Sequence, residues 1–541
     1  GSFGDSNFRV KAHGIMNELD IIPVLTLLGI NNIGTSGLNG DVWFNWQSSK
    51  GGSLQGNLAT DNFRVSSSKH NNATKLSNLK ADYLIDINPD ASFQMWVTDL
   101  ALEWKNSVYS LADFNLTRSE NNDFYISVRE ANIARLLKLV GRVVKLPTKL
   151  ADILGAISPQ GILQNIYVNK AGNVAGVDGV SFSAKVKSLN TLAWGGAPGV
   201  DDLSGYVTAN ALSGRFDIDA KDLLLAFPGI YDNKIPASRL LGSVAWSVGE
   251  TEVLVNSGPL VVVGDFGSGN AQLDLAIPFK KLADNYPLMS LLIGVRDFDV
   301  KYRNQVIPAV VGESLIEWLD QSILAGNASE VGFIYYGSLL KNDTNRQVVQ
   351  VELDATDAAL KYDPAWPVAE NIATKVIVSN GDARGYVKSA TIYDSVLSNI
   401  NVDVIPKDGI IDLEVSGDID GPAANILTLF KETSLKEILG PAVDTWQSTG
   451  NYSATINLAM PLVSGAAPKI VITGELHDVD LEKSDANLQF TKLHGDISYT
   501  TDNGLSSENI DGGLWGQNFQ ANIKTLDKQT VVNLKGAIEI T

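Results

Sequence analysis

The chain has 541 residues, a formal net charge of −19, and 42 lysines and arginines that are scattered rather than clustered. Nucleic acids and anionic membrane surfaces are bound through clustered positive charge, so both are disfavoured as partners. The chain has no cysteine, which excludes disulfides, zinc sites with cysteine ligands and thiol catalysis.

The two ends of the sequence suggest an excised segment. No run approaches the roughly 20 apolar residues of a membrane helix, and no signal peptide is visible. Gly1-Ser2 resembles a cloning remnant, and an alternating run from Val532 to Ile540 reaches the last residues. We therefore expect a piece of a longer protein.

Four short apolar segments, each followed by a glycine and a strand-like run, are predicted along the chain. Their positions are residues 23–30; Leu150, Ile153, Leu154 and Ile157; Val311, Leu315, Trp318, Leu319 and Ile323; and Ile438 and Leu439, after the capping-box pair Ser434 and Glu437. The glycines that follow them are Gly40, Gly161, Gly326 and Gly450.

The third segment shows the pattern most fully. Pro308 suits the first turn of a helix, and Glu313 lies on the N-terminal side, where acidic groups are favoured. Gly326 is expected to end this helix, which spans residues 308–325, because a helix often closes on a left-handed residue. A strand-like run at residues 333–336 follows.

Length alone suggests three or four domains, but no proline-rich, serine-rich or highly charged linker separates the segments. We therefore predict one continuous body of four groove segments: residues 1–131, residues 132–305 opened by a helical stretch, residues 306–425 opened by the helix 308–325, and residues 426–541.

Most of the remaining sequence alternates apolar and polar residues, which is typical of strands with one apolar face. The clearest runs are Tyr83/Ile85/Ile87, Phe93/Met95/Val97, Val244/Trp246/Val248, Leu273/Leu275/Ile277, Val349/Val351/Leu353, Val376/Val378, Ile411/Leu413/Val415, the even positions of 452–460, Ile470/Ile472 and Val532/Leu534. The dipeptides Asn380-Gly381, Asp408-Gly409, Asn503-Gly504 and Asp511-Gly512 predict antiparallel hairpins between strands.

The apolar face of such a sheet needs a cover, and the predicted helices are too few to supply it. Either the sheet closes on itself as a sandwich or barrel, or it curls into a trough whose inside receives an apolar ligand. The 48 glycines suit strongly bent strands, but the pattern alone leaves both possibilities open.

Several motifs resemble one family in order and spacing. Residues 150–168 (LADILGAISPQGILQNIYV) are similar to the helix and PxG entry of the central domain of YhdP proteins, members of the AsmA-like group. Residues 307–339 resemble the same family's helix-and-strand signature, and residues 359–371 (ALKYDPAWPVAEN) carry its Y-x-P-x-W-P run. Residues 511–516 (DGGLWG) resemble the glycine-rich hairpin of the AsmA-like C-terminal region.

This resemblance implies a mostly β fold with a few short helices: an elongated, twisted, mainly antiparallel sheet curled into a hydrophobic trough, also called a β-taco. It implies a periplasmic segment of a protein anchored in the Gram-negative inner membrane, which conducts phospholipids to the outer membrane. The implied partners are phospholipids and the two membranes, the latter through parts outside this sequence. The implied protein is monomeric, binds no nucleic acid, needs no cofactor and is not an enzyme.

The predicted lipid-binding residues are the inward positions of the alternating runs. They are Phe44, Ile85, Met95, Val244, Trp246, Leu275, Val349, Val351, Leu353, Val376, Val378, Leu413, Ile456, Leu458, Ile470 and Ile472. The alternative from another class is a structural or adhesive β-scaffold with a sealed core and no ligand. The two differ in whether the inward row lines a continuous groove or interdigitates with an opposing sheet.

The other motifs do not indicate a metal site or a nucleotide-binding site. The four histidines, His13, His70, His477 and His494, have no partners at metal-ligand spacing, and the calcium-loop pattern at Asp418-Ile-Asp420-Gly421 is incomplete. Gly264, Gly267 and Gly269 lack the spacing of a dinucleotide site. Trp43, Trp96, Trp194, Trp246 and Trp366 suit either a groove or ordinary packing.

Overall fold

The computed structural model describes residues 8–537 apart from 21, 23–32, 36, 66–73, 105–106, 144–145, 175–178, 229–230, 232, 281–284, 304–312, 341–342, 408–409, 434–443, 464–465 and 527–528. The chain divides into two compact units. Unit 1 comprises residues 1–264, 271–289 and 338–341, and unit 2 comprises residues 265–270, 290–337 and 342–541.

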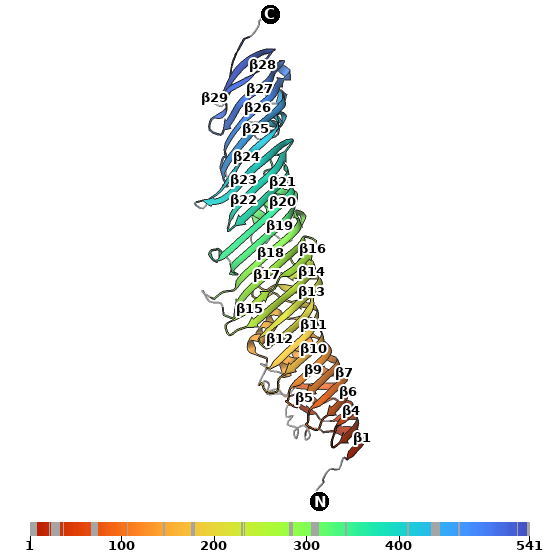
Figure 1. Cartoon of the computed structure of the whole chain (residues 1–541). Coiled ribbons are helices and arrows are strands. Elements are labelled where there is room, and N and C mark those ends of the chain that lie inside the picture. Colours follow the sequence, from red (N-terminus) through yellow and green to blue (C-terminus); the bar gives the residue numbers. More distant parts are fainter. Residues whose placement is uncertain are drawn as a thin grey trace. The chain divides into compact units, whose positions relative to one another are not determined.

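Unit 1 is an antiparallel meander in which successive long strands are neighbours (Figure 1). Its elements are β1 Arg9–Leu19, β2 Ile33–Thr35, β3 Leu38–Gln47, β4 Gly51–Thr60, β5 Phe63–Val65, β6 Thr74–Ile87, β7 Phe93–Trp104, β8 Ser107–Arg118, β9 Phe124–Asn132, α2 Ile133–Val143, α3 Thr148–Ile157, β10 Gln160–Lys170, β11 Val180–Thr191, β12 Gly199–Asn210, β13 Ser213–Ala226, β14 Ile235–Val248, β15 Glu252–Ser257, β16 Leu260–Gly264 and most of β17 Gly267–Pro278. The short strands β2 and β5 form a side branch on β6.

Unit 2 repeats the same arrangement. Its elements are most of β18 Leu288–Asp299, η1 Val300–Tyr302, α5 Glu313–Ser322, β19 Ile323–Ser338, η3 Thr344–Arg346, β20 Gln347–Leu360, β21 Ala369–Ser379, β22 Asp382–Ile392, β23 Ser395–Lys407, β24 Ile410–Pro422, α6 Ala423–Glu432, β25 Trp446–Pro461, β26 Lys469–Lys483, η5 Ser484–Ala486, β27 Leu488–Thr500, β28 Gly504–Leu514, β29 Gln517–Leu526 and β30 Gln529–Gly536. From β19 to β30 each strand pairs antiparallel with the next. The predicted class, a mostly β protein with an antiparallel sheet and a few short helices, is confirmed.

The alternating runs all lie in strands, and their hairpin signals are mostly correct. Asn380-Gly381 forms the turn between β21 and β22, with φ of +50° and +102°, and Asn503-Gly504 closes the hairpin of β27 and β28. The turn predicted at Asp511-Gly512 is wrong, because both residues lie inside β28. The turn falls instead at Trp515-Gly516, where φ is +53° and +80°. Residues 408–409 lie outside the described part of the chain.

The helix predictions had mixed outcomes. The stripe from Leu150 to Ile157 forms α3, and the third segment forms α5. Residues 23–30 and the capping box at Ser434 and Glu437 lie outside the described residues. Sequence patterns missed α6, which begins directly after Pro422 without a side-chain cap.

All four glycines that follow the predicted apolar segments lie inside strands, including Gly326, which was expected to end a helix. Gly326 does not end α5, which stops at Ser322, and lies in β19 with φ of +144°. Gly40, Gly161 and Gly450 likewise have positive φ, at +147°, +138° and +87°, in β3, β10 and β25. At Gly40 and Gly450 a Cβ would come within 2.1 Å and 2.3 Å of a carbonyl oxygen of the next strand. Only glycine fits such an approach.

Three of these glycines face a left-handed residue in the neighbouring strand. Gly161 lies opposite Ser188, Gly326 opposite Asp357, and Gly450 opposite Asp478, and the three residues have φ of +49°, +52° and +50°. The strand register shifts at each of these places. Such bulges bend a strand and increase its twist, so each pair marks a place where the sheet curls.

We expect Gly161→Ala to lower the free energy of unfolding by about 1–3 kcal/mol, because its Cβ would meet the Ser188 carbonyl oxygen at 2.7 Å in a strained backbone. The matched control is Gly155→Ala in α3, where a Cβ meets nothing within 4 Å. In a helix this control should stabilise the chain by about 0.5–1 kcal/mol. Urea unfolding followed by circular dichroism measures both, and equal midpoints for the two variants would contradict the bulge argument.

Candidate functional site

A continuous row of apolar side chains crosses unit 1 from strand to strand. Directly paired residues point to the same face of a sheet, so the pairs can be followed across fourteen strands. This row, called row 1, runs Ala12, Phe44, Leu54, Ile85, Met95, Leu116, Ile126, Val168, Phe182, Ala209, Gly214, Trp246, Val255 and Leu275. It contains five of the predicted lining residues.

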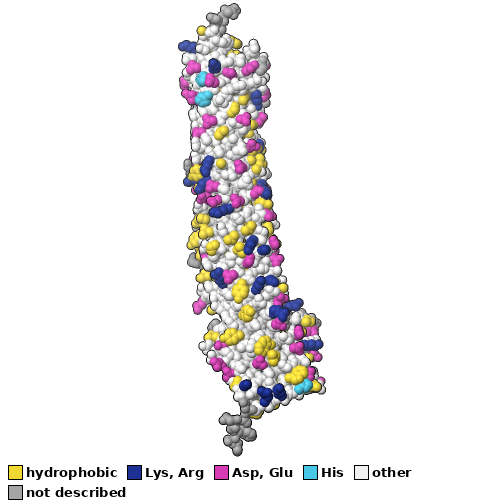
Figure 2. Space-filling view, turned by 45° about the vertical axis from the view of Figure 1, so that its right-hand side comes forward, with side chains coloured by type: hydrophobic (Ala, Val, Ile, Leu, Met, Phe, Trp, Pro, Cys, Tyr) yellow, Lys and Arg dark blue, Asp and Glu magenta, His cyan; other side chains and the backbone are white. Residues whose placement is uncertain are grey.

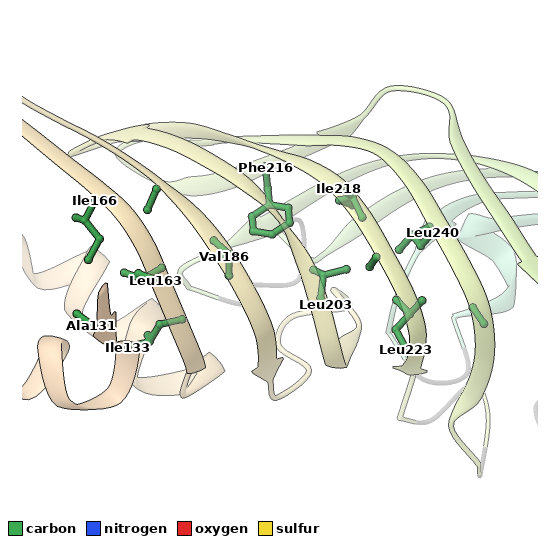
Figure 3. Packing of buried hydrophobic residues seen from close by; sticks show 13 residues of the cluster. Ala131, Ile133, Leu163, Ile166, Val186, Leu203, Phe216, Ile218, Leu223 and Leu240 are labelled. Atoms are coloured by element: carbon green, nitrogen blue, oxygen red, sulfur yellow. The ribbon is translucent and has the colours of Figure 1, made fainter. Parts of the chain in front are cut away.

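The sixth predicted residue of unit 1 lies in a neighbouring row. Val244 pairs with Phe216, which continues through Val207 to Ala184. In Figure 3 the strands of unit 1 arch over Phe216, Ile218 and Leu203, whose side chains lie beneath the arch. The apolar face is therefore the inner face of a curved sheet in this unit.

Unit 2 has two rows of the same kind, which contain seven of its ten predicted residues, and the other three lie beside them. Row 2 runs Val331, Leu353, Val376, Gly385, Val402, Val415, Leu458 and Ile470. Row 3 runs Phe333, Val351, Val378, Ala383, Val404, Leu413 and Met460. Ile456 pairs with Ile472 beside row 2, and Val349 pairs with Tyr335 beside row 3. Ten predicted residues from five strands thus lie together on one face.

These rows are neither sealed nor fully open. All sixteen predicted residues are half-buried except Leu275, which is 2% exposed. Side chains that interdigitate with an opposing sheet are normally almost completely buried, since protein interiors are close-packed. The exposure of the rows therefore leaves apolar surface available to a ligand.

The two halves of the strands differ in burial. Row 1 runs beside the short hairpin turns; for example, Ile85 and Met95 flank the turn at residues 88–92. Further along the strands, towards the helices, Leu163, Leu203 and Leu223 are at most 8% exposed. Leu136 and Leu137 of α2 pack against this buried cluster, and Figure 3 shows a helix beside Ala131 and Ile133. The helix side is thus closed, whereas the hairpin side retains exposure.

The opposite face of the sheet carries the charges. Arg384 and Asp403 face each other across β22 and β23 with Nε and Oδ1 3.6 Å apart, and Lys375 pairs with Glu352. Figure 2 shows acidic and basic side chains interspersed along the face in view. Each such exposed pair contributes at most about 1 kcal/mol, so the pairs mainly keep this face in water.

The tryptophans named in the sequence analysis lie in different parts of the fold. Trp246 belongs to row 1, and its ring fills the space above Gly214, where a Cβ would lie 2.2 Å from Cζ2. Trp43 is 43% exposed and stacks on His13. Trp194 and Trp366 lie in helix-side loops between strands. Trp96 pairs with Leu84 and Asn115, so it lies on the face opposite row 1. Of these five tryptophans, Trp246 alone belongs to a row.

The histidines and the incomplete calcium-loop pattern do not form a metal site in the described residues. His477 bonds Ser453 at 2.9 Å and His494 bonds Asp478 at 2.9 Å, while His70 lies outside the described residues. Among the residues that the structure describes, no group of three His, Asp or Glu side chains could hold a metal ion. The Asp418-Ile-Asp420-Gly421 stretch is part of β24.

Comparison with known proteins places the chain in a family. The family model described as YhdP protein matches residues 7–541. The chain belongs to the YhdP family. It is 21% identical over 489 residues to the intermembrane phospholipid transporter YhdP of Escherichia coli strain K12, an alignment that covers 86% of this chain and 37% of that protein. No solved structure matches the chain significantly. No helix in the described part has the length and apolar character to cross a bilayer.

Sequence reasoning named the Y-x-P-x-W-P run of this YhdP-family chain as a family motif and missed its packing on the helix side. Tyr362 of the Y-x-P-x-W-P run packs against a cluster formed by Ala369, Ile372 and Ala390. The backbone N–H of Lys361 donates to the carbonyl of Ser322, the last residue of α5, at 2.8 Å. In this loop Tyr362 and Trp366 are half-buried, whereas the three residues between them are exposed. The two aromatic residues were the available signal, because large aromatic side chains in a loop often pack against the body of the protein.

This packing predicts a pH dependence. Burial, followed by the charges of Asp363 and Tyr393, raises the pKa of Tyr362 from 10.0 to about 12. The folded state holds this proton more tightly than the unfolded state, so its contribution to stability is full below pH 10 and is lost as the pH rises towards about 12. Tyr362→Phe keeps the ring and removes the titrating hydroxyl. We expect denaturant unfolding to show a smaller loss of stability across this window in the variant, and an equal loss would contradict the assignment.

Proposed function

We propose that the inner face of this chain carries phospholipids, with acyl chains lying against rows 1, 2 and 3 and headgroups remaining in water. The observation that carries the proposal is the register of the rows: half-buried apolar side chains follow one another on one face from strand to strand. An acyl chain covered by these side chains avoids about 0.8 kcal/mol of water exposure per methylene.

The lining also suits movement along the rows. Neighbouring strands are about 4.8 Å apart, so a lipid that moves by one strand meets another side chain of similar size and polarity. Val415, Leu458 and Ile470 of row 2 are examples of such successive positions. With similar contacts at each step, no position binds much more tightly than the next, and transfer requires no chemical reaction or cofactor.

We infer the cellular setting from the family and from the relative's name. The chain spans 37% of the length of the E. coli intermembrane phospholipid transporter. We therefore infer that it is a monomeric periplasmic segment of a longer protein, anchored in the inner membrane, which passes phospholipids between the inner and outer membranes. The remaining length of such a protein would supply the contacts with both membranes.

The competing function is a structural scaffold whose apolar face is permanently sealed. The buried helix-side clusters would suit a sealed scaffold, but the partial exposure of rows 1, 2 and 3 favours a ligand. The two functions predict different effects of a charged residue introduced on the inner face of the sheet. In a sealed core an unpaired charge unfolds the protein, whereas in a lipid-filled groove it displaces lipid and can be solvated.

We expect the protein purified from bacterial membranes or periplasm to carry phospholipid, detected by native mass spectrometry and lipid extraction. Ile472→Glu places a charge beside row 2, and Val351→Glu places one in row 3. Because a charge among acyl chains costs about 2.5–3.5 kcal/mol, local occupancy should fall by at least about tenfold.

The matched controls are Val471→Glu and Val348→Glu, on the same strands β26 and β20 but on the outer face, where both valines are 42% exposed. These controls should keep the bound lipid. Unfolding of the inward variants in thermal melts, together with lipid-free wild-type protein, would instead support the sealed scaffold.

A further inference from the structure

The helix-side loop at residues 192–198 forms a tight turn. Trp194 and Ala197 exchange backbone hydrogen bonds of 3.1 Å and 2.9 Å, and the central Gly195 and Gly196 have φ of +61° and +100°. Positive φ at both central residues is typical of a type I′ turn. At the base of the loop, the Leu192 N–H donates to the Ile157 carbonyl at the end of α3, at 2.8 Å.

The tip of this turn lies against the end of row 1. A Cβ on Gly195 would come within 2.6 Å of Ile277 Cγ2. A Cβ on Gly196 would come within 2.4 Å of Leu339 Cδ1 and 3.4 Å of Leu275 Cδ1. The glycines thus allow the backbone itself to rest on these side chains, all of which belong to unit 1.

The tip of this turn lies beside the one predicted lining residue that is buried, Leu275. Leu275 and Ile277 are 2% and 3% exposed, whereas Trp246 and Val255, the preceding members of row 1, are half-buried. The row is therefore accessible up to Val255 and covered at Leu275.

We propose that the 192–198 loop is a strap that closes row 1 at Leu275, and that an acyl chain displaces it to pass beyond Val255. This inference rests on the proposed function, since it assigns the strap a role only if lipid occupies the row. It identifies a place where passage along the sheet is controlled by this chain itself.

The contact between the turn and Leu275 is apolar, so it can form and break without a change in hydrogen bonding. The turn satisfies the backbone groups of Trp194 and Ala197 internally, so its tip can lie on an apolar surface or leave it without losing those hydrogen bonds. When the strap lifts, an acyl chain takes its place against Leu275 and Ile277. The sheet's apolar surface is then covered in both states, and the exchange requires no net exposure of that surface to water.

The test uses a phosphatidylethanolamine with a diazirine in its acyl chain, incubated with the whole chain in mixed micelles and irradiated. Mass spectrometry then compares labelling of the peptide with Met95, an uncovered position of row 1, and of the peptide with Leu275 and Ile277. Gly196→Val forces the tip away from its contacts. Gly381→Val is the control, since it has a similar φ of +102° in a turn but nothing within 4 Å of its Cβ.

We expect Met95 to be labelled in all three proteins, and the Leu275 peptide to be labelled at least about fivefold more in Gly196→Val than in wild type or Gly381→Val, because labelling there requires the covered state to open. Equal labelling of the Leu275 peptide in all three, with Met95 labelled, would overturn the strap while leaving the lipid function intact.

If Met95 is not labelled in the wild type, the proposed function fails, and with it the role of the strap in passage. If Gly196→Val does not fold, single-cysteine variants can measure directly whether the loop covers Leu275, since this sequence contains no cysteine. Leu275→Cys should then react with a maleimide at least about tenfold more slowly than Val255→Cys, because it must await local opening. Equal rates would overturn the strap.

Discussion

The structure depends on the close contact between a glycine of positive φ in one strand and a left-handed residue in the next. An apolar sheet face cannot remain flat and uncovered in water, and a few short helices cannot cover it. Gly161 opposite Ser188, and Gly450 opposite Asp478, bend the strands and increase their twist instead, so the sheet curls at these places. The strand halves beside the hairpins retain the exposure seen in the rows.

The same arrangement of a helix end, a strand bulge and a loop occurs twice, once at α3 and once at α5. The positive-φ glycine, Gly161 or Gly326, lies four residues after the last helical residue, Ile157 or Ser322. The left-handed residue opposite it, Ser188 or Asp357, lies four residues before the loop residue that donates its N–H back to the helix end. Both hydrogen bonds, Leu192 to Ile157 and Lys361 to Ser322, measure 2.8 Å. Each helix end is thus tied to the loop two strands later, and both loops carry a tryptophan and a proline. The order of the elements and the contacts between them are therefore both repeated at α3 and α5.

The strands and the inward face were predictable because a period of two is a local property. Val351 and Leu353, or Ile470 and Ile472, had to share a face once their segment became a strand. Their alignment into rows was not predictable, since register depends on turns and bulges, and a one-residue shift reverses every face. The bulges gave only a faint signal: Gly326 looked like a helix end, and Asp357 like an ordinary polar position. The helix α6 was missed because Pro422 supplies no capping side chain, and the strap was missed because Gly196 and Leu275 are far apart in sequence.

A one-layered curved sheet separates two requirements that a two-layered sandwich combines. In a sandwich the apolar face is both the source of stability and the only place a ligand could bind, so an empty site would be a cavity in the core. Here the buried clusters, such as that of Leu163, Leu203 and Leu223, lie on the helix side, while rows 1, 2 and 3 lie towards the hairpins. Removing ligand from the rows leaves those clusters packed. The proposed function requires a fold that stays stable while its lining is filled and emptied, and the separation of the buried clusters from the rows meets this requirement.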